Sequence, residues 1–275
     1  MSTSLTDAPP APDVVSFFKA LADETRLTIL RLLALTDLRA GELVEHLHCP
    51  HNAVSYHLKL LRALGLLRDR RSTADARDIY YSLDHDRLRA LYTAAGDALQ
   101  AWPEPDHDMQ ETAPEADASR PLRVLFLCTH NSARSQLAEG ILRYLGGDAV
   151  EAYSAGSEPA DVHPYALALL QEWGIDTTQH RAKSLDLFAG QSFDYIITVC
   201  DRIREHCPLF PTDSVRIHWS LPDPVLITDE AEQRQAFRTV QRELITRIRY
   251  LLNLPHPATG RRIAVRSLVP LEGAS

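Results

Sequence analysis

The spacing of hydrophobic residues differs between the two halves of the chain. In the first half, apolar side chains recur every three or four positions, which is the period of an amphipathic helix. In DETRLTILRLLALT, residues 23–36, this spacing places four of them on one face: Leu27, Leu30, Leu33 and Ala34. In PHNAVSYHLKLLRALGLL, residues 50–67, it does the same for Val54, Leu58, Leu61 and Leu64. The first half is therefore predicted to be mainly α-helical.

A hairpin is predicted to follow these helices. Gly65 stands where a residue in left-handed conformation typically ends a helix. The next stretch, LLRDRRSTADARDIYYSL, has the pattern of a strand, a polar turn and a second strand that contains Ile79 and two tyrosines. A short helix, AGELVEHL, precedes the helix that starts near His51. Two helices, a turn, a helix and a two-stranded hairpin make up a winged helix-turn-helix.

The second half alternates apolar strand-like runs with amphipathic helical ones, which indicates an α/β domain. LRVLFLC, residues 122–128, has the pattern of a buried strand, and SQLAEGILRYL, residues 135–145, that of a helix. Between the halves, the acidic and Pro-rich segment 102–119 has no apolar period and is predicted to be a linker. We expect a domain at 12–100, a linker at 101–120, a domain at 121–255 and a partly ordered tail at 256–275.

Composition narrows the class of protein. The 275 residues are 45% hydrophobic and 24% charged, as in a globular protein. The polar start, MSTSLTDAPPAPD, lacks the features of a secretory signal, and no stretch is long enough to span a membrane, so we expect a cytoplasmic protein. A net charge of −8 argues against a generally basic nucleic-acid binder. Between His51 and Arg77, however, cationic residues outnumber acidic ones, which suits contact with phosphate.

The motif CTHNSAR, residues 128–134, lies between the predicted strand and helix. Such a loop presents backbone N–H groups and the positive end of a helix to one point, and so binds a tetrahedral oxyanion. The same field should lower the pKa of Cys128 and hold it as a thiolate nucleophile. Arg134 can bind two oxyanion oxygens with its planar fork. The residues predicted to bind the oxyanion are Thr129, His130, Asn131, Ser132, Ala133, Arg134 and Ser135.

Two further cysteines bear on which reaction takes place. The loop suits either hydrolysis of a phosphate monoester or reduction of arsenate, and reduction requires additional thiols. Cys200 follows another predicted strand, and Cys207 comes after a short polar helical segment. We predict a relay in which Cys200 attacks the Cys128 adduct and Cys207 attacks the resulting disulfide.

The first half resembles the ArsR family of dimeric, metal-responsive repressors, on the segments LADETRLTILRLL, AVSYHLKLLRALGLL and YYSL. The resemblance, which covers about Pro12 to Gly96, implies a homodimer that places the helix near residues 52–64 in the major groove of operator DNA. The predicted DNA-binding residues are Asn52, Ser55, Tyr56, Lys59, Arg68, Arg70, Arg71 and Arg77. The residues His46, His48, Cys49 and His51 form a cluster of side chains that bind Zn²⁺ or a similar ion. Because residues two apart on a helix do not face each other, we predict no metal site there, and what the first half senses stays open.

The second half resembles the low-molecular-weight tyrosine phosphatase fold, and in particular its thioredoxin-coupled arsenate reductases. The segments that carry the resemblance are CTHNSARSQ, YSAGSEP, the pair VC and CP, and HWSLPDP. It implies a four-stranded parallel sheet, Asp223 as general acid, no tightly bound cofactor, and thioredoxin or an equivalent thiol reductant as electron donor. It also implies that Asn131 holds the loop in shape and that Ser135 hydrogen-bonds the Cys128 thiolate.

Two departures from this family's pattern affect its expected ligands. Some members bind potassium through side chains that match Asn131, Glu139 and Ser154. Here the ammonium of Lys183 stands in place of a further acidic ligand, so we predict no potassium site. The aromatic residues that usually follow the Asp-Pro pair of the phosphatases are Val225 and Leu226 here, which disfavours an aryl phosphate substrate.

These observations predict a DNA-binding repressor fused to an arsenate reductase, with phosphate as a competitor of arsenate. Two alternatives are open. One is a regulator whose second half binds an oxyanion without turnover, and the other is a tyrosine phosphatase fused to a repressor. A lack of arsenate turnover with a thioredoxin system would favour the regulator. Cys200→Ser should leave the activity of a phosphatase intact, whereas it should abolish turnover by a reductase.

Overall fold

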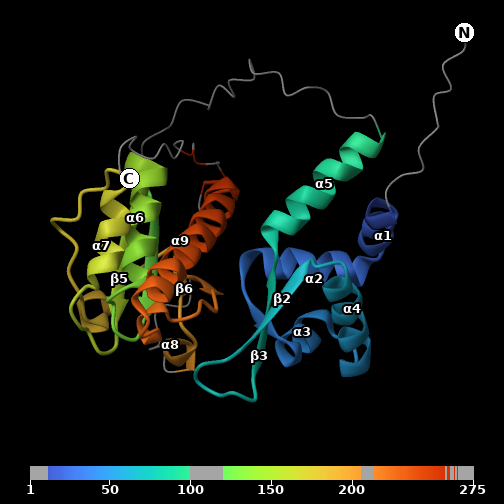
Figure 1. Cartoon of the computed structure of the whole chain (residues 1–275), viewed down its shortest axis with the longest axis horizontal. Coiled ribbons are helices and arrows are strands. Elements are labelled where there is room, and N and C mark those ends of the chain that lie inside the picture. Colours follow the sequence, from blue (N-terminus) through green and yellow to red (C-terminus); the bar gives the residue numbers. More distant parts are fainter. Residues whose placement is uncertain are drawn as a thin grey trace, which may run out of the picture. The chain divides into compact units, whose positions relative to one another are not determined.

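A computed structural model describes residues 12–99, 120–205, 214–257, 259, 260, 263 and 265. The chain divides into two compact units, one containing α1 to α5 and the other β4 to α9 (Figure 1). Within the described residues, no helix combines the length and the apolar character needed to cross a lipid bilayer.

The first unit is mainly helical, as predicted. Its elements are α1 (Pro12–Leu21), α2 (Glu24–Leu35), β1 (Leu38–Arg39), α3 (Ala40–Leu47), α4 (His51–Ala63), β2 (Leu67–Arg71), β3 (Ile79–Leu83) and α5 (His85–Leu99). In α4, Val54, Leu58 and Leu61 are buried in the core, which confirms their predicted face. In α2 the prediction for Leu27 is wrong, because this side chain is 43% exposed. The buried stripe of α2 is Ile29, Leu30 and Leu33, so Leu27 lies at its edge.

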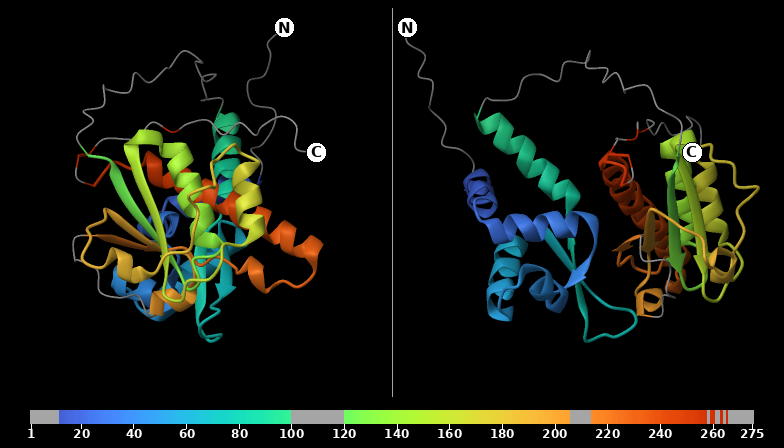
Figure 2. Two further views of the ribbon diagram at one scale, coloured as in Figure 1. Left: turned by 90° about the vertical axis from the view of Figure 1, so that its left-hand side faces the viewer. Right: turned by 180° about the vertical axis from the view of Figure 1, so that it is seen from behind.

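The hairpin of the first unit, drawn in cyan in Figure 2, belongs to a small sheet with strand order β1-β3-β2. Gly65, just after α4, has a φ of +70°, the left-handed conformation that its position predicted. At the start of α2, the side chain of Asp23 caps the helix by accepting from the amide of Arg26 at 2.9 Å. Strand β1 was not predicted, because two residues are too few to show a strand's alternation.

The second unit is an α/β fold. Its elements are β4 (Leu122–Cys128), α6 (Arg134–Gly146), β5 (Val150–Gly156), α7 (Pro164–Gln171), β6 (Tyr195–Thr198), α8 (Asp201–Glu205), β7 (Val215–His218) and α9 (Glu230–Asn253), with 3-10 turns η1 (Gly147–Ala149), η2 (Leu185–Phe188) and η3 (Pro224–Leu226). Within the described residues, the strands form a four-stranded parallel sheet in the order β5-β4-β6-β7, as expected. Helices α6, α7 and α9 pack against one another.

The topology of this sheet brings the two reactive segments together. β4 is a central strand, and Val124, Leu125, Phe126 and Leu127 are completely buried, which explains its unbroken apolar run. In the parallel register of β4 and β6, Leu127 pairs with Thr198. The loop after Cys128 and the turn that holds Cys200 therefore emerge at the same edge of the sheet, which is where α/β folds bind ligands.

Candidate active site

The loop between β4 and α6 has the backbone of an anion-binding nest. It runs from Cys128, the last residue of β4, to Arg134, the first residue of α6. Asn131 in this loop has a φ of +48°, a left-handed conformation uncommon for a residue with a side chain. The N-cap residue Ala133 offers no side chain to the first amides of α6. These amides are therefore available to a bound anion.

A neighbouring segment fixes which way the peptide groups of the loop point. The amides of Glu158, Ala160 and His163 donate to the carbonyls of Thr129, His130 and Ser132, respectively, each at 2.9 Å. In a planar trans peptide, the N–H points opposite to the C=O. With these carbonyls held outward, the N–H groups of the following loop residues turn inward. The segment 158–163 was not predicted to take part, because its contribution is made by its backbone.

Cys128 lies at the base of the nest and is 3% exposed. Its sulfur accepts from the amide of Asn131 at 3.0 Å and lies 2.9 Å from Ser135 Oγ, the contact that the family resemblance implied. Burial nevertheless raises the pKa of the Cys128 thiol, and neighbouring Cys200 adds to this, against Arg134 and the two hydrogen bonds. The predicted lowering of this pKa is therefore wrong, since desolvation outweighs the stabilising groups.

Arg134 is already engaged by protein groups. One guanidinium nitrogen lies 2.5 Å from Asp223 Oδ2, and the other donates to the carbonyl of Leu221 at 3.0 Å. The two charged side chains are 8% and 19% exposed, so solvent screens the pair weakly. The Asp223 carboxylate thus occupies the fork that an oxyanion would bind. An incoming oxyanion must compete with Asp223 for it.

The second thiol lies at the same site. Cys200 is 2% exposed, and its sulfur lies 3.4 Å from the hydroxyl of Thr129 in the loop. Cys128, Cys200, Arg134 and Asp223 line one pocket, together with Thr129, His130, Ser132, Ala133, Arg202, Val225 and Leu226. The structure thus brings most of the predicted catalytic residues together. Cys207 lies outside the described residues, so its part of the relay stays a prediction.

Behind the loop, a buried polar network supports Asn131. The side-chain amide of Asn131 donates to Ser154 Oγ at 2.8 Å and to Ser135 Oγ at 2.9 Å. Ser154 in turn donates to the carboxylate of Glu139, and the ammonium of Lys183 lies 3.0 Å from that same carboxylate. Lys183 thus provides the positive charge beside Glu139 that the sequence led us to expect.

Two supporting residues were missed by the sequence analysis. Gln136, completely buried in α6, donates to both the backbone carbonyl and the side-chain oxygen of Asn131. Its signal was its place in the first turn of the helix, directly after the predicted loop. At Gly156, an added Cβ would lie 2.6 Å from the carbonyl oxygen of Thr129 and 2.8 Å from the nitrogen of Asn131. This position therefore requires glycine, because the loop backbone passes directly over it.

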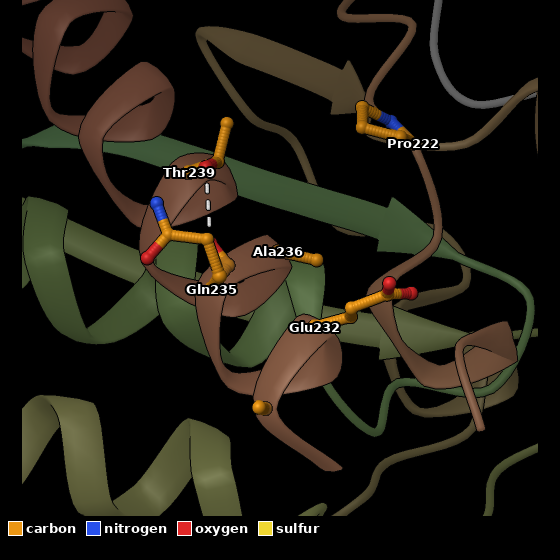
Figure 3. Close-up of a pocket in the computed structure, with 6 residues that line it drawn as sticks. Pro222, Glu232, Gln235, Ala236 and Thr239 are labelled. Carbon is orange, nitrogen blue, oxygen red and sulfur yellow. Dashed lines mark hydrogen bonds between the residues drawn. The ribbon is translucent and has the colours of Figure 1, made fainter. Parts of the chain in front are cut away.

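Another pocket of the second unit carries no comparable chemistry. It has a volume of about 520 Å³ and is lined by Pro222 and by residues of α9, namely Ala231, Glu232, Gln235, Ala236 and Thr239 (Figure 3). The hydroxyl of Thr239 donates to the carbonyl of Gln235, one turn earlier in the same helix. Its lining contains no thiol and no cation, so it offers no site for an oxyanion.

In the first unit, the predicted DNA-contacting side chains of α4 share one face. Asn52, Ser55, Tyr56 and Lys59 are all exposed, opposite the buried Val54, Leu58 and Leu61. Of the hairpin cations, Arg68 pairs with Asp84 at 2.7 Å and Arg77 with Asp75 at 2.6 Å, while Arg71 donates to the carbonyl of Ala76. Arg70 lies on β2 and is partly buried. Across the residues described, no group of three or more His, Cys, Asp or Glu side chains is arranged to hold a metal ion.

Comparison with known proteins divides the chain in the same way. Residues 123–256 match the family model of low molecular weight phosphotyrosine protein phosphatase, and residues 23–69 match that of bacterial regulatory proteins of the arsR family. An arsenate reductase of Halalkalibacterium halodurans is 37% identical over 127 residues, which are 46% of this chain and 91% of that protein. An arsenate reductase of Bacillus subtilis is 35% identical over 114 residues, 42% of this chain and 82% of its own length.

Among solved structures, a thioredoxin-dependent arsenate reductase of Corynebacterium glutamicum is 26% identical to this chain. The match covers 82% of this chain and 94% of the chain of that structure. Its TM-score of 0.39 is too low to establish a shared arrangement.

Proposed function

The chain belongs, through residues 123–256, to the low molecular weight phosphotyrosine protein phosphatase family and carries an arsR-family domain before it, and we propose that it is a DNA-binding repressor fused to an arsenate reductase. The observation that carries the enzymatic part is the pair of buried thiols, Cys128 and Cys200, in one pocket with Arg134. A phosphatase of this loop type needs one thiol, and a second one beside it suits electron transfer to the substrate.

In the proposed reaction, arsenate enters the loop and displaces the Asp223 carboxylate from Arg134. Because the pKa of the Cys128 thiol is raised, the sulfur carries a proton, and this proton passes through the bound oxyanion to the displaced Asp223 carboxylate as the sulfur becomes a nucleophile. The sulfur attacks arsenic, and a hydroxyl group of arsenate leaves as water with that same proton, which Asp223 returns as general acid. Arsenic is still As(V) in this adduct.

Reduction occurs in the next step. The Cys200 sulfur attacks the Cys128 sulfur, an S–S bond forms, and the S–As bond breaks with its electron pair remaining on arsenic. Arsenite, As(III), leaves. Cys207 then attacks Cys200, which frees Cys128 and leaves a Cys200–Cys207 disulfide for thioredoxin or an equivalent thiol reductant to reduce. No tightly bound cofactor is required in this scheme, because two thiols supply both electrons.

The test uses the full chain with arsenate, thioredoxin, thioredoxin reductase and NADPH, following oxidation of NADPH. We expect turnover in the wild type and none in Cys200→Ser, which should still accumulate the Cys128 adduct. A chain that cleaves an aryl phosphate equally well with and without Cys200, but never reduces arsenate, is instead a phosphatase. If neither substrate is turned over while phosphate or arsenate alters affinity for DNA, the protein is an oxyanion-responsive regulator.

For the first unit we propose binding of operator DNA as a homodimer, through α4 and the hairpin. Support comes from the exposed face of α4 and from the cations of β2 and the following turn. Lys59→Ala should weaken binding to duplex DNA of any sequence. It should also reduce the magnitude of the slope of the logarithm of the association constant against the logarithm of salt concentration by about 1. Lys19→Ala, in which an exposed lysine of α1 is removed, is the matched control and should leave the slope unchanged. Fluorescence anisotropy at several salt concentrations measures both.

A further inference from the structure

A second group of buried polar side chains lies beside Cys200 and has no part in the chemistry described so far. Its members are Thr198, Asp201, His218 and Ser220, which are between 0% and 7% exposed. Thr198 ends β6, and Asp201 begins α8, so the two residues flank Cys200 along the chain. His218 ends β7, and Ser220 lies in the segment that leads to Asp223.

One carboxylate oxygen joins these side chains. Ser220 donates its hydroxyl to Asp201 Oδ1 at 2.7 Å, and His218 Nε2 lies 3.2 Å from the same oxygen. The other ring nitrogen, Nδ1, lies 2.8 Å from the hydroxyl oxygen of Thr198. The cluster therefore ties the turn that holds Cys200 to the strand end and segment that hold the general acid.

His218 uses both of its ring nitrogens within the cluster. Nδ1 lies 2.8 Å from the hydroxyl oxygen of Thr198, and Nε2 lies 3.2 Å from the Asp201 carboxylate. The Thr198 hydroxyl also lies 3.3 Å from the carbonyl of Ile217. Asp201 is completely buried, and a buried carboxylate is tolerated only with hydrogen-bonding partners of this kind.

We propose that Asp201 and His218 are positioning residues for the thiol-transfer step: they hold Cys200 in line with the sulfur of Cys128. The inference rests on the proposed function, since it assigns these residues to the step in which the S–S bond forms and the S–As bond breaks. Oxyanion binding and adduct formation, which depend on the loop and Arg134, should not depend on them. Effective attack requires reacting atoms held within a few tenths of an ångström, so loosening this turn should slow transfer selectively.

The first experiment needs no arsenate. In a Cys207→Ser background, diamide takes two electrons and two protons from Cys128 and Cys200 and leaves a disulfide between them, which mass spectrometry of alkylated peptides quantifies over time. With Asp201→Asn added, we expect this disulfide to form about tenfold more slowly or slower still. Alkylation of Cys128 by iodoacetamide, and its protection by phosphate, should match the background protein.

The matched control is Asp194→Asn. Asp194 is also a buried aspartate of this sheet, 6% exposed, but it lies just before β6, where it accepts from the amide of Arg123 at 2.8 Å. This variant loses the same charge at the opposite end of the strand and should form the Cys128–Cys200 disulfide at the background rate. Adding His218→Gln to Asp201→Asn restores a neutral hydrogen-bonded pair and should recover at least about a third of the lost rate.

Three results would overturn the inference: an unchanged disulfide rate in Asp201→Asn, an equal loss in Asp194→Asn, or a parallel loss of phosphate protection at Cys128. Arsenate turnover separates this failure from that of the proposed function. If the wild type reduces arsenate, Asp201→Asn should lower kcat by a factor similar to that in the diamide assay and leave KM unchanged. If the wild type does not reduce arsenate, the proposed function fails, and the diamide rates still decide the placement of Cys200.

Discussion

The most specific prediction concerns the ammonium of Lys183. Its nitrogen lies 3.0 Å from the Glu139 carboxylate, and the two side chains are 13% and 7% exposed. Glu139 also accepts from the hydroxyl of Ser154, which in turn accepts from the side-chain amide of Asn131 in the anion loop. Lys183→Met removes the charge and keeps most of the side-chain stem. It therefore leaves a buried carboxylate with reduced compensation at the base of the loop.

Breaking a buried ion pair from one side typically costs about 3–5 kcal/mol. We expect about 3 kcal/mol here, because Arg143 still lies 2.7 Å from the other carboxylate oxygen of Glu139. The matched control is Arg143→Met. That side chain is 48% exposed, so solvent screens its charge, and its loss should cost about 1 kcal/mol or less. Adding Glu139→Gln to Lys183→Met removes the uncompensated charge and should restore part of the stability.

The assay is urea unfolding in potassium chloride and in choline chloride at equal ionic strength. Tryptophan fluorescence follows the second unit, in which Trp219 is 2% exposed. The wild type should be equally stable in both salts. Lys183→Met should be less stable in choline and should regain stability in potassium, since the oxygens of Glu139 and Ser154 then become available to an added cation. Equal stability of wild type and variant, or potassium dependence in the wild type, would refute the assignment of Lys183 as the resident positive charge.

Further predictions follow from the loop. Gly156→Ala places a Cβ 2.6 Å from the Thr129 carbonyl, so it should lower the free energy of unfolding in urea by roughly 1–3 kcal/mol. It should also abolish the protection of Cys128 by phosphate against alkylation. As a control, Gly190→Ala adds a Cβ with no atom within 4 Å and should leave that protection intact. Asp223→Asn removes the charge that pairs with Arg134, so phosphate should inhibit arsenate reduction about tenfold more strongly. The same variant lacks the general acid, so its kcat should fall at least about 100-fold. An unchanged inhibition constant for phosphate would contradict the competition between Asp223 and the oxyanion. Because burial raises the pKa of Cys128 above its ordinary 9.0, the folded state holds this proton more tightly than the unfolded state. The free energy of unfolding should then fall as the pH rises above about 9, and it should fall less in Cys128→Ser. The rate at which Cys128 is alkylated in the absence of an oxyanion should be slow at neutral pH and increase in the alkaline range.

Local patterns in the sequence account for several features of this protein. The helical period of the first half, Gly65 after α4 and the apolar run of β4 each reflect local geometry, which a short window of residues expresses fully. The position of Cys128 between a strand and a helix, six residues before Arg134, likewise indicated the anion loop. The exposed face of α4 could also be predicted, since the buried and exposed positions of one helix alternate with a fixed period.

Other properties depend on contacts between residues that are distant in sequence. The amides of the segment 158–163 orient the loop, and Gly156 makes room for it, yet neither is visible in the residues of the loop itself. The sequence led to the wrong direction for the pKa of Cys128, because ionisation depends on burial and on the neighbouring thiol of Cys200, which the next strand of the sheet brings beside it. The cluster around Asp201 has the same origin: parallel strands bring together side chains from β6 and β7 that no local pattern relates.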